Sequence, residues 1–271
     1  HTIFKCDWSS DVGSSDLGAT RGEVTRRTEL ALLAAAAKGP GTLVAFDPAI
    51  DKLSAEQRLI HRELPRAITA HELEVHYQPI VSAGGAAFVG VEALLRWTHV
   101  THGSISPAAF IPVAEQMGLM DTLGAFVLRK ALQDAKRWPD LYVAVNLSPS
   151  SLVDIELPQR LERMLLERGL DSSLLILEIT EDVIMSDRDR ARLILDELRR
   201  IGIQVAVDDF GTGYSSLAYL RELPIDELKL DRSFVAPMGE DPRAAAIVRS
   251  TIELAHSLGM TMVAEGVEIG R

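Results

Sequence analysis

The sequence has little cysteine and no long apolar run, and each lack excludes a class of protein. A single cysteine, Cys6, allows no disulfide framework, so a reducing, cytoplasmic setting is expected. A membrane-spanning helix needs about 18 consecutive apolar residues, but the most apolar stretch, residues 30–37, is short and flanked by charge. The N-terminus also lacks the basic and apolar regions of a signal peptide. We therefore expect no membrane contact within this stretch of chain.

Positive charge is also scarce. The 271 residues include 28 Lys and Arg against 39 Asp and Glu, which gives a net charge of −11. Such a chain is repelled by nucleic acid and by anionic membranes, so a nucleic-acid duplex is not an expected partner. The balance suits instead a site built from carboxylates, which needs metal ions before it can accept an anionic substrate.

The two ends of the chain differ from the rest. Residues 6–17 are rich in Ser and Asp and show no periodicity, which is typical of a disordered linker. Back-translation gives a second interpretation: a common sequencing-adapter string encodes these residues except Gly13, and its reverse complement encodes the final Ile-Gly-Arg. We therefore expect residues 1–17 to be a non-native, adapter-derived segment and the chain to stop inside a domain.

Between the ends, the apolar pattern divides the chain into two parts. Residues 22–48 predict a helix, a Gly-Pro-Gly break and a short strand, and residues 55–68 predict an amphipathic helix that connects them to the next unit. Seven apolar strands then alternate with amphipathic helices. These strands are expected at residues 73–81, 88–97, 141–148, 174–180, 204–210, 227–232 and 261–267.

Seven strands with helical crossovers imply a buried, mostly parallel sheet. An open α/β sheet is the structural alternative, but the even repetition favours a (β/α) barrel. A barrel needs about eight strands to close. We therefore predict an α/β fold with an incomplete barrel, whose eighth strand would follow residue 271.

Polar side chains stand at or just after the end of six of these strands. They are Glu92, Asn146, Glu178, the pair Asp208 and Asp209, Lys229 and Glu265. In a barrel the C-terminal ends of the strands meet at one face, which carries the active site. Carboxylates gathered there without partners would be unfavourable, and an oxygen-only ligand set selects Mg²⁺ or Mn²⁺ over zinc. The pattern therefore predicts a site for hard metal ions.

Taken singly, each polar residue has a simpler interpretation. A lone Glu after a strand is usually a loop residue, and Asn146 could cap the next helix. Residues 209–211 spell the Asp-Phe-Gly of kinases, but no other kinase motif accompanies them. His99 and His102 could suggest a metal pair, but their polar surroundings favour a solvated turn. The same placement repeated on six strands is what favours a common site.

The motifs around these residues resemble the EAL-domain family of cyclic di-GMP phosphodiesterases. The resemblance covers residues 64–268, and seven motifs follow one another in the order typical of the family. They are YQPI (77–80), EALLRW (92–97), NLSP (146–149), LEITE (177–181), DDFGTGYSSL (208–217), LKLDRSFV (228–235) and AEGVE (264–268). The upstream residues resemble the tail of a GGDEF domain.

This resemblance implies a modified TIM barrel whose first strand runs antiparallel to the others. Residues 69–271 would be a truncated EAL domain, preceded by a GGDEF remnant at 18–50 and a linker helix at 51–68. The implied reaction is hydrolysis of cyclic di-GMP to linear pGpG with two Mg²⁺ or Mn²⁺ ions, in a homodimer formed through the EAL domain. The alternatives are a non-catalytic cyclic di-GMP receptor or interaction module, or a fragment that is inactive because it is incomplete.

The resemblance also assigns a role to each site residue. The metal ligands would be Glu92, Asn146, Glu178 and Asp208 for one ion, and Asp209 for the second. The catalytic residues would be Glu92 together with Lys229 and Glu265, of which the last two position the attacking water.

Four further residues have roles by resemblance outside the metal site. Gln78 and Arg96 would contact the dinucleotide, Arg96 at a phosphate, and Asp231 would lie nearby. Glu181 would brace the loop at residues 210–217, which in the family shapes the metal site and couples it to dimerisation.

Overall fold

The computed structural model describes most of the chain, in two compact units. The described residues are 20–37, 39, 41–44, 48–85, 87–211 and 218–267. The units are His1–Arg66 and Ala67–Arg271. The proposed adapter-derived residues 1–17 and 269–271 lie outside the described residues.

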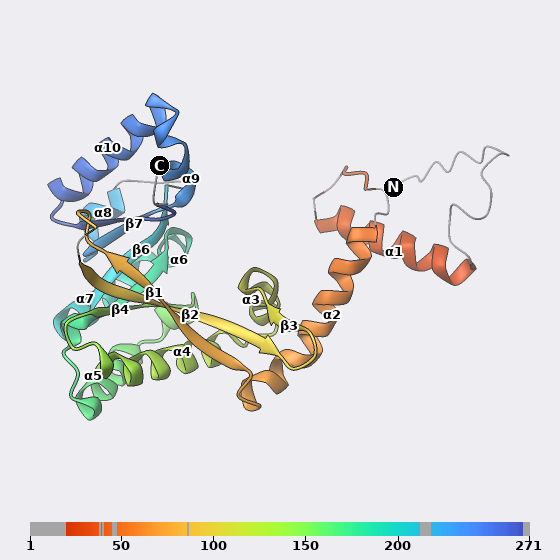
Figure 1. Ribbon diagram of the computed structural model, residues 1–271, viewed down its shortest axis with the longest axis horizontal. Helices are drawn as coiled ribbons and strands as arrows, with labels where there is room; N and C mark the ends of the chain where they lie inside the picture. The colour runs from red at the N-terminus through yellow and green to blue at the C-terminus, as the bar shows by residue number, and fades with distance from the viewer. Residues whose placement is uncertain are drawn as a thin grey trace. The chain divides into compact units, whose positions relative to one another are not determined.

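The first unit confirms the predicted helices. The described part of the predicted strand, residues 42–44, is not a strand. Helix α1 spans Arg21–Ala37, and α2 spans Pro48–Thr69 and extends into the second unit (Figure 1). The strand expected after the Gly-Pro-Gly break is not formed at residues 42–44, where Leu43 is 91% exposed. No other described strand of this unit is there to pair with it, and residues 45–47 lie outside the description.

The second unit is built on a curled sheet that confirms the predicted incomplete barrel. Its main strands are β1 (Leu73–Val81), β2 (Phe88–His99), β4 (Tyr142–Asn146), β5 (Leu175–Thr180), β6 (Gln204–Phe210), β7 (Glu227–Leu230) and β8 (Thr261–Ala264), paired in that order. Strand β1 is antiparallel to β2, and every later pair along this path is parallel. No described strand joins β8 to β1.

Several strand features differ from the expectation. Strand β2 continues to His99, whereas β4 and β8 end at Asn146 and Ala264, before their predicted ends at 148 and 267. A short strand that the sequence did not predict, β3 (Gly103–Ile105), pairs antiparallel with the end of β2. Strand β7 ends at Leu230, earlier than predicted, because Asp231 leaves the sheet and accepts a hydrogen bond from the Ser233 backbone N–H at 3.0 Å. That bond caps the next helix.

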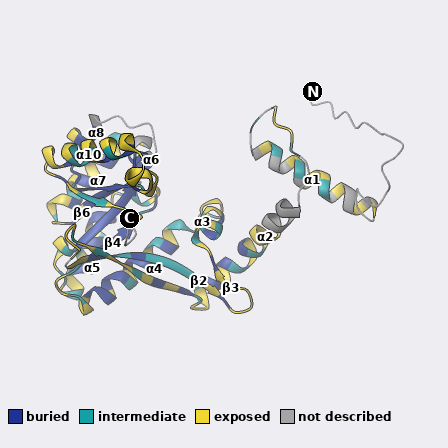
Figure 2. Cartoon of the chain, turned by 45° about the horizontal axis from the view of Figure 1, so that its top comes forward, coloured by how far each residue is buried: buried dark blue, intermediate teal, exposed yellow. Residues whose placement is uncertain are grey.

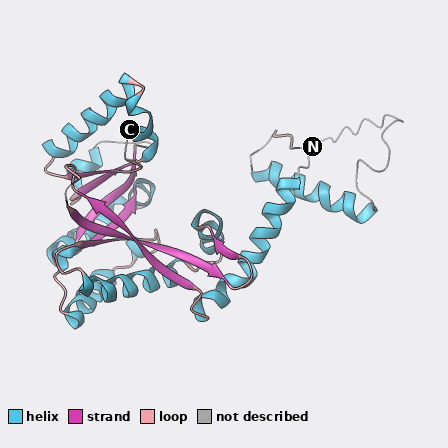
Figure 3. Ribbon diagram, viewed as in Figure 1, coloured by secondary structure: helices cyan, strands magenta, loops and turns pink. Residues whose placement is uncertain are grey.

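Helices cover the outer face of the sheet, as Figures 1 and 3 show. They are α3 (Pro107–Gln116), α4 (Met120–Asp134), α5 (Leu157–Arg168), α6 (Glu181–Ser186), α7 (Arg188–Arg200), α8 (Ala218–Glu222), α9 (Arg232–Val235) and α10 (Pro242–Ser257). Figure 2 shows that the longer helices bury one face and expose the other. Within the described residues, no helix combines the length and the apolar character needed to span a membrane.

The strands sort their side chains by the period of two that a pleated sheet imposes. Val143, Leu177 and Val205 lie in the large apolar core with helix residues such as Leu161 and Leu195. Their neighbours along the strands point to the opposite, concave face. The small buried cluster there consists of Ala144, Ile176 and Ala206, with Tyr142 packed against it.

One polar contact holds the antiparallel strand β1 against the helical layer. The Tyr77 hydroxyl donates a hydrogen bond of 2.9 Å to Asp134 of α4, and the Tyr77 ring makes an edge contact with Trp138 at 4.9 Å between centroids. Lys130 pairs with Asp134 at 3.1 Å. Asp134 is buried, so its carboxylate depends on these partners.

We expect Tyr77→Phe to lower the free energy of unfolding by about 1.5 kcal/mol, because it removes a hydrogen bond to a buried carboxylate. Urea unfolding followed by circular dichroism measures the change. Tyr142→Phe is the matched control, since the Tyr142 hydroxyl makes no hydrogen bond with the described residues. An equal decrease in the free energy of unfolding of the two variants would contradict a stabilising role of the Tyr77 hydrogen bond.

Candidate functional site

The concave face of the sheet changes from apolar to polar toward the C-terminal ends of the strands. Two residues beyond Ala144, Ile176 and Ala206 along the same face come Asn146, Glu178 and Asp208. In the parallel register Asn146 lies opposite Glu178, whereas Asp208 lies opposite Thr180, two residues beyond Glu178 on the same face. Because side chains alternate between the two faces of a strand, each of these strands places one polar group on the concave face.

The ammonium group of Lys229 lies at the centre of this face. Its Nζ atom lies close to one oxygen of each of four carboxylates. The distances are 2.9 Å to Glu265, 3.0 Å to Glu178, 3.1 Å to Asp208 and 3.5 Å to Glu92. The Lys229 side chain is only 2% exposed. The structure thus brings together four of the predicted site carboxylates around the predicted site lysine.

Burial and charge act against each other in this cluster. Burial disfavours the charged form of Lys229, but Glu178, Asp208 and Glu92 outweigh it and raise the Lys229 pKa, so the ammonium stays protonated. Burial raises the pKa of Glu178, although Lys229 opposes the shift. Burial likewise raises the pKa of Glu265, again against the effect of Lys229. A single ammonium leaves these carboxylates with excess negative charge.

The donor set fits divalent cations. Glu178 is buried, and its Oε1 pairs with Lys229 Nζ at 3.0 Å, but its Oε2 accepts no hydrogen bond within the described part of the chain. Buried oxygens in that state are unfavourable unless a charged partner binds them. The neighbouring groups offer oxygen ligands rather than sulfur or imidazole, which suits Mg²⁺ or Mn²⁺.

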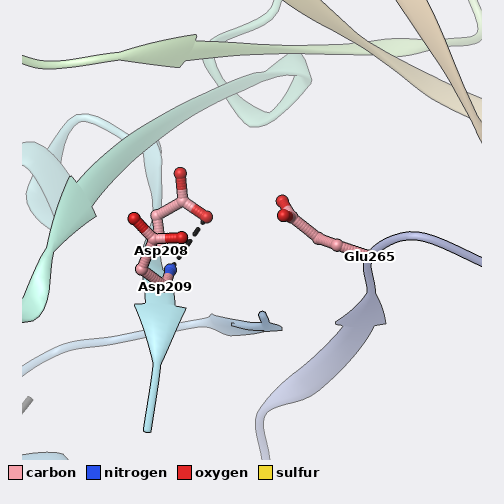
Figure 4. A group of neighbouring side chains, drawn as sticks. All are labelled: Asp208, Asp209 and Glu265. Atoms are coloured by element: carbon pink, nitrogen blue, oxygen red, sulfur yellow. Dashed lines mark hydrogen bonds between the residues drawn. The ribbon is translucent and has the colours of Figure 1, made fainter. Parts of the chain in front are cut away.

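Strand β6 breaks its alternation at the site, and this break brings two adjacent aspartates together. Pairing with β7 shifts register between Val207 and Phe210, and Asp209 takes a left-handed conformation with φ of 53°. Two residues of β6 therefore stand opposite Lys229 alone, which is a β-bulge. Ligand oxygens of Asp208, Asp209 and Glu265 lie within 4.8 Å of one another (Figure 4).

This crowding of carboxylates affects Asp209 directly. Burial raises the pKa of Asp209, and the charges of Asp208 and Asp231 raise it further. The Asp209 backbone N–H donates a 3.0 Å hydrogen bond to Asp208, which holds the bulge closed. Like charges brought this close favour binding of a cation between them.

A hydrogen bond to Glu92 holds the Asn146 side chain. Its Nδ2 donates a 3.1 Å hydrogen bond to Glu92. Behind it, Asp121 of α4 accepts hydrogen bonds from Ser150 at 2.6 Å and Ser148 at 3.2 Å, which fasten the loop that follows β4. Asp121 was not predicted, because it lies on a helix and belongs to none of the motifs at the strand ends.

Gln78 and Arg96 lie on the same face as Glu92. Gln78 stands directly opposite Glu92 in the antiparallel pair β1–β2, and opposed residues point to the same side. Arg96 follows Glu92 by four residues along β2, so it shares that side. Its Nη1 donates to the Leu95 backbone carbonyl at 2.9 Å.

Asp231 and Glu181 lie at the starts of helices. Hydrogen bonds from Ser233 lower the pKa of Asp231, which caps α9. Glu181 is buried at the first position of α6. Its predicted partner, the loop at 210–217, falls largely outside the described residues, at 212–217.

The interpretation of His99 and His102 as a solvated turn is wrong for His99. The His99 ring is buried, and its Nδ1 accepts hydrogen bonds from the backbone N–H groups of Thr101 at 3.1 Å and His102 at 3.3 Å. His99 therefore closes the turn between β2 and β3. Nδ1 is occupied by these donors, so the structure does not support a metal pair there.

Comparison with known proteins agrees with this geometry. The EAL domain family model matches residues 61–270. An uncharacterized signaling protein of Caulobacter vibrioides is 43% identical over 254 residues, covering 93% of this chain and 31% of the relative. The bifunctional diguanylate cyclase/cyclic di-GMP phosphodiesterase MucR of Pseudomonas aeruginosa is 39% identical over 256 residues, covering 93% of this chain and 37% of the relative. The chain thus spans about a third of the length of these relatives.

A solved structure gives the same result at the level of the fold. The PaMucR phosphodiesterase, in a complex with c-di-GMP, superimposes with a TM-score of 0.74 at 41% identity, covering 78% of this chain and 88% of that one. The family match extends over most of the chain, and the predicted resemblance to the EAL-domain family is confirmed. This chain therefore belongs to the EAL domain family.

Proposed function

We propose that this chain is the phosphodiesterase module of a bacterial signalling protein and opens cyclic di-GMP to linear pGpG with Mg²⁺ or Mn²⁺. The observation that carries the proposal is the Lys229 ammonium among four carboxylates at the C-terminal ends of the strands. The name of MucR and the c-di-GMP in the PaMucR complex support the choice of substrate.

The ligand set divides between two cations. Glu92, Asn146, Glu178 and Asp208 would hold the first. Asp209, with Asp208 and Glu265 close to it, would hold the second. When bound, two divalent cations activate water and stabilise the negative charge that grows on a phosphodiester during in-line attack. The excess negative charge around Lys229 supports this assignment.

The chain's own residues would orient the reactants. Lys229 and Glu265, whose Nζ and carboxylate oxygen lie 2.9 Å apart, would together orient the attacking water, one as a donor and the other as an acceptor. The raised pKa of Lys229 keeps its positive charge next to the phosphoryl oxygens as their charge develops. Gln78 and Arg96, on the Glu92 side of the sheet, would bind the dinucleotide, with the Arg96 guanidinium at a phosphate. Asp231 would lie at the edge of the same site.

Other parts of the proposal concern the rest of the protein. A homodimer through the EAL domain, bracing of the 210–217 loop by Glu181, and a GGDEF remnant at 18–50 stay predictions from the family resemblance. So do the domain boundaries at residues 51–68 and 69–271.

We expect Glu92→Ala to lower the rate of cyclic di-GMP hydrolysis by on the order of 100-fold or more. Removal of a residue that only orients a metal ligand already lowers metal affinity or activity by about 10- to 100-fold. Glu115→Ala, an exposed glutamate of α3, is the control and should keep full activity. Formation of pGpG with Mg²⁺ or Mn²⁺ is followed by chromatography.

The same assay separates the proposal from a non-catalytic receptor. It is run with this chain and with the full-length gene product, because the chain spans only about a third of its relatives. Metal-dependent binding of cyclic di-GMP without turnover by the full-length protein would overturn the enzymatic proposal and favour the receptor.

We expect Lys229→Met to destabilise the metal-free chain by about 3 kcal/mol, because it leaves buried carboxylates without their counter-charge. Mg²⁺ should restore more stability to this variant than to the unsubstituted chain. Urea unfolding with and without Mg²⁺ measures both effects, and Lys136→Met, at an exposed lysine, is the control. An unchanged free energy of unfolding in metal-free Lys229→Met would contradict this account of the cluster.

A further inference from the structure

The short helix α9 lies directly after β7 and contacts the backbone that follows each neighbouring strand. Two of its side chains pack against glycines: Arg232 against Gly266, and Phe234 against Gly211. Gly266 comes one residue after Glu265, and Gly211 comes two residues after Asp209. Both glycines therefore adjoin carboxylates that face each other across the site.

The contact at Gly266 leaves no room for a side chain. Gly266 has φ of 70°, and a Cβ atom there would lie 2.4 Å from Cγ and 2.8 Å from Cδ of Arg232. These atoms belong to the stem of the arginine, close to the helix backbone, so they cannot move aside as a flexible tip could. On its other side, Glu265 is fixed by a 3.1 Å hydrogen bond from its backbone N–H to the Leu230 carbonyl.

The contact at Gly211 has the same form. Gly211 has φ of 97°, and a Cβ atom there would lie 3.0 Å from two ring atoms of Phe234. The ring thus covers the backbone at the point where β6 leaves its bulge. Helix α9 itself is anchored, because Asp231 caps its first turn and Val235 is buried with Leu230 and Val248.

We propose that Arg232 and Phe234 are positioning residues, which hold the backbone after β8 and β6 so that Glu265 and Asp209 face each other. The stem of Arg232 and the ring of Phe234 carry this role by packing. The inference rests on the proposed metal-binding role of the two carboxylates. It makes α9 the element that sets the separation between ligands from two strands that are not adjacent in the sheet.

The test measures Mn²⁺ affinity of the whole chain by isothermal titration calorimetry, together with the melting temperature. Gly266→Ala should bind Mn²⁺ about tenfold more weakly. This is the smallest loss of metal affinity that is typical when a residue that orients a metal ligand is changed. Gly118→Ala is the matched control, because Gly118 has a similar φ of 67° with nothing within 4 Å of its Cβ position. It should lower the melting temperature through backbone strain but leave Mn²⁺ affinity unchanged.

Variants of the two side chains isolate the packing contact. Arg232→Ala and Phe234→Ala should each weaken Mn²⁺ binding several-fold, whereas Arg232→Met, which keeps the stem, should bind within about twofold of the unsubstituted chain. The double variant Arg232→Ala/Gly266→Ala should bind less weakly than the product of the two single losses, because the new methyl group no longer meets Cγ and Cδ and only the Cβ atom at residue 232 remains, at 3.0 Å. Residues in contact show such non-additivity.

Each remaining outcome decides against the inference. Equal Mn²⁺ affinity of Gly266→Ala and Gly118→Ala, or additive losses in the double variant, would overturn the positioning role while leaving the proposed function intact. Equal losses in Arg232→Met and Arg232→Ala would also overturn it, because charge rather than packing would then be responsible. If the unsubstituted chain binds no Mn²⁺, the proposed metal site fails and this inference fails with it.

Discussion

The burial of one ammonium group among carboxylates is the interaction on which the site depends. Transferring Lys229 out of water is unfavourable, and several carboxylates around it offset that cost. Glu92, Glu178 and Asp208 lie on successive strands, offset in register, and Glu265 follows the end of β8. A slip of one residue in any pairing would turn the carboxylate of that strand to the helical side.

The apolar layer beneath the site strengthens this interaction. Ala144, Ile176 and Ala206 are almost fully buried and exclude water from the strand segments below the charges. Charges next to such a layer interact more strongly than charges in water. The fold therefore provides both the placement of the charges and the low polarity around them.

Most of the fold could be predicted because the strands carry unambiguous apolar patterns. The predicted segments 73–81 and 204–210 coincide with β1 and β6. Strand β3 was missed because its three residues are too few to show a period. The convergence of the site residues followed from their common place at the strand ends, whereas the bulge at Asp209, the burial of His99 and the α9 contacts of Arg232 depend on neighbours distant in sequence. No local pattern contains that information.

The bulge in β6 also changes the distance between the carboxylates that one strand places on the concave face. Residues on one face of a regular strand are separated by two steps of about 3.3 Å each, whereas adjacent Cα atoms are about 3.8 Å apart. Metal ions in two-metal sites lie about 3.5–4 Å apart. By bringing Asp208 and Asp209 together, the bulge gives a single strand two adjacent carboxylates for the proposed metal pair. The extra residue thus brings the spacing of these ligands close to that of the proposed dinuclear centre.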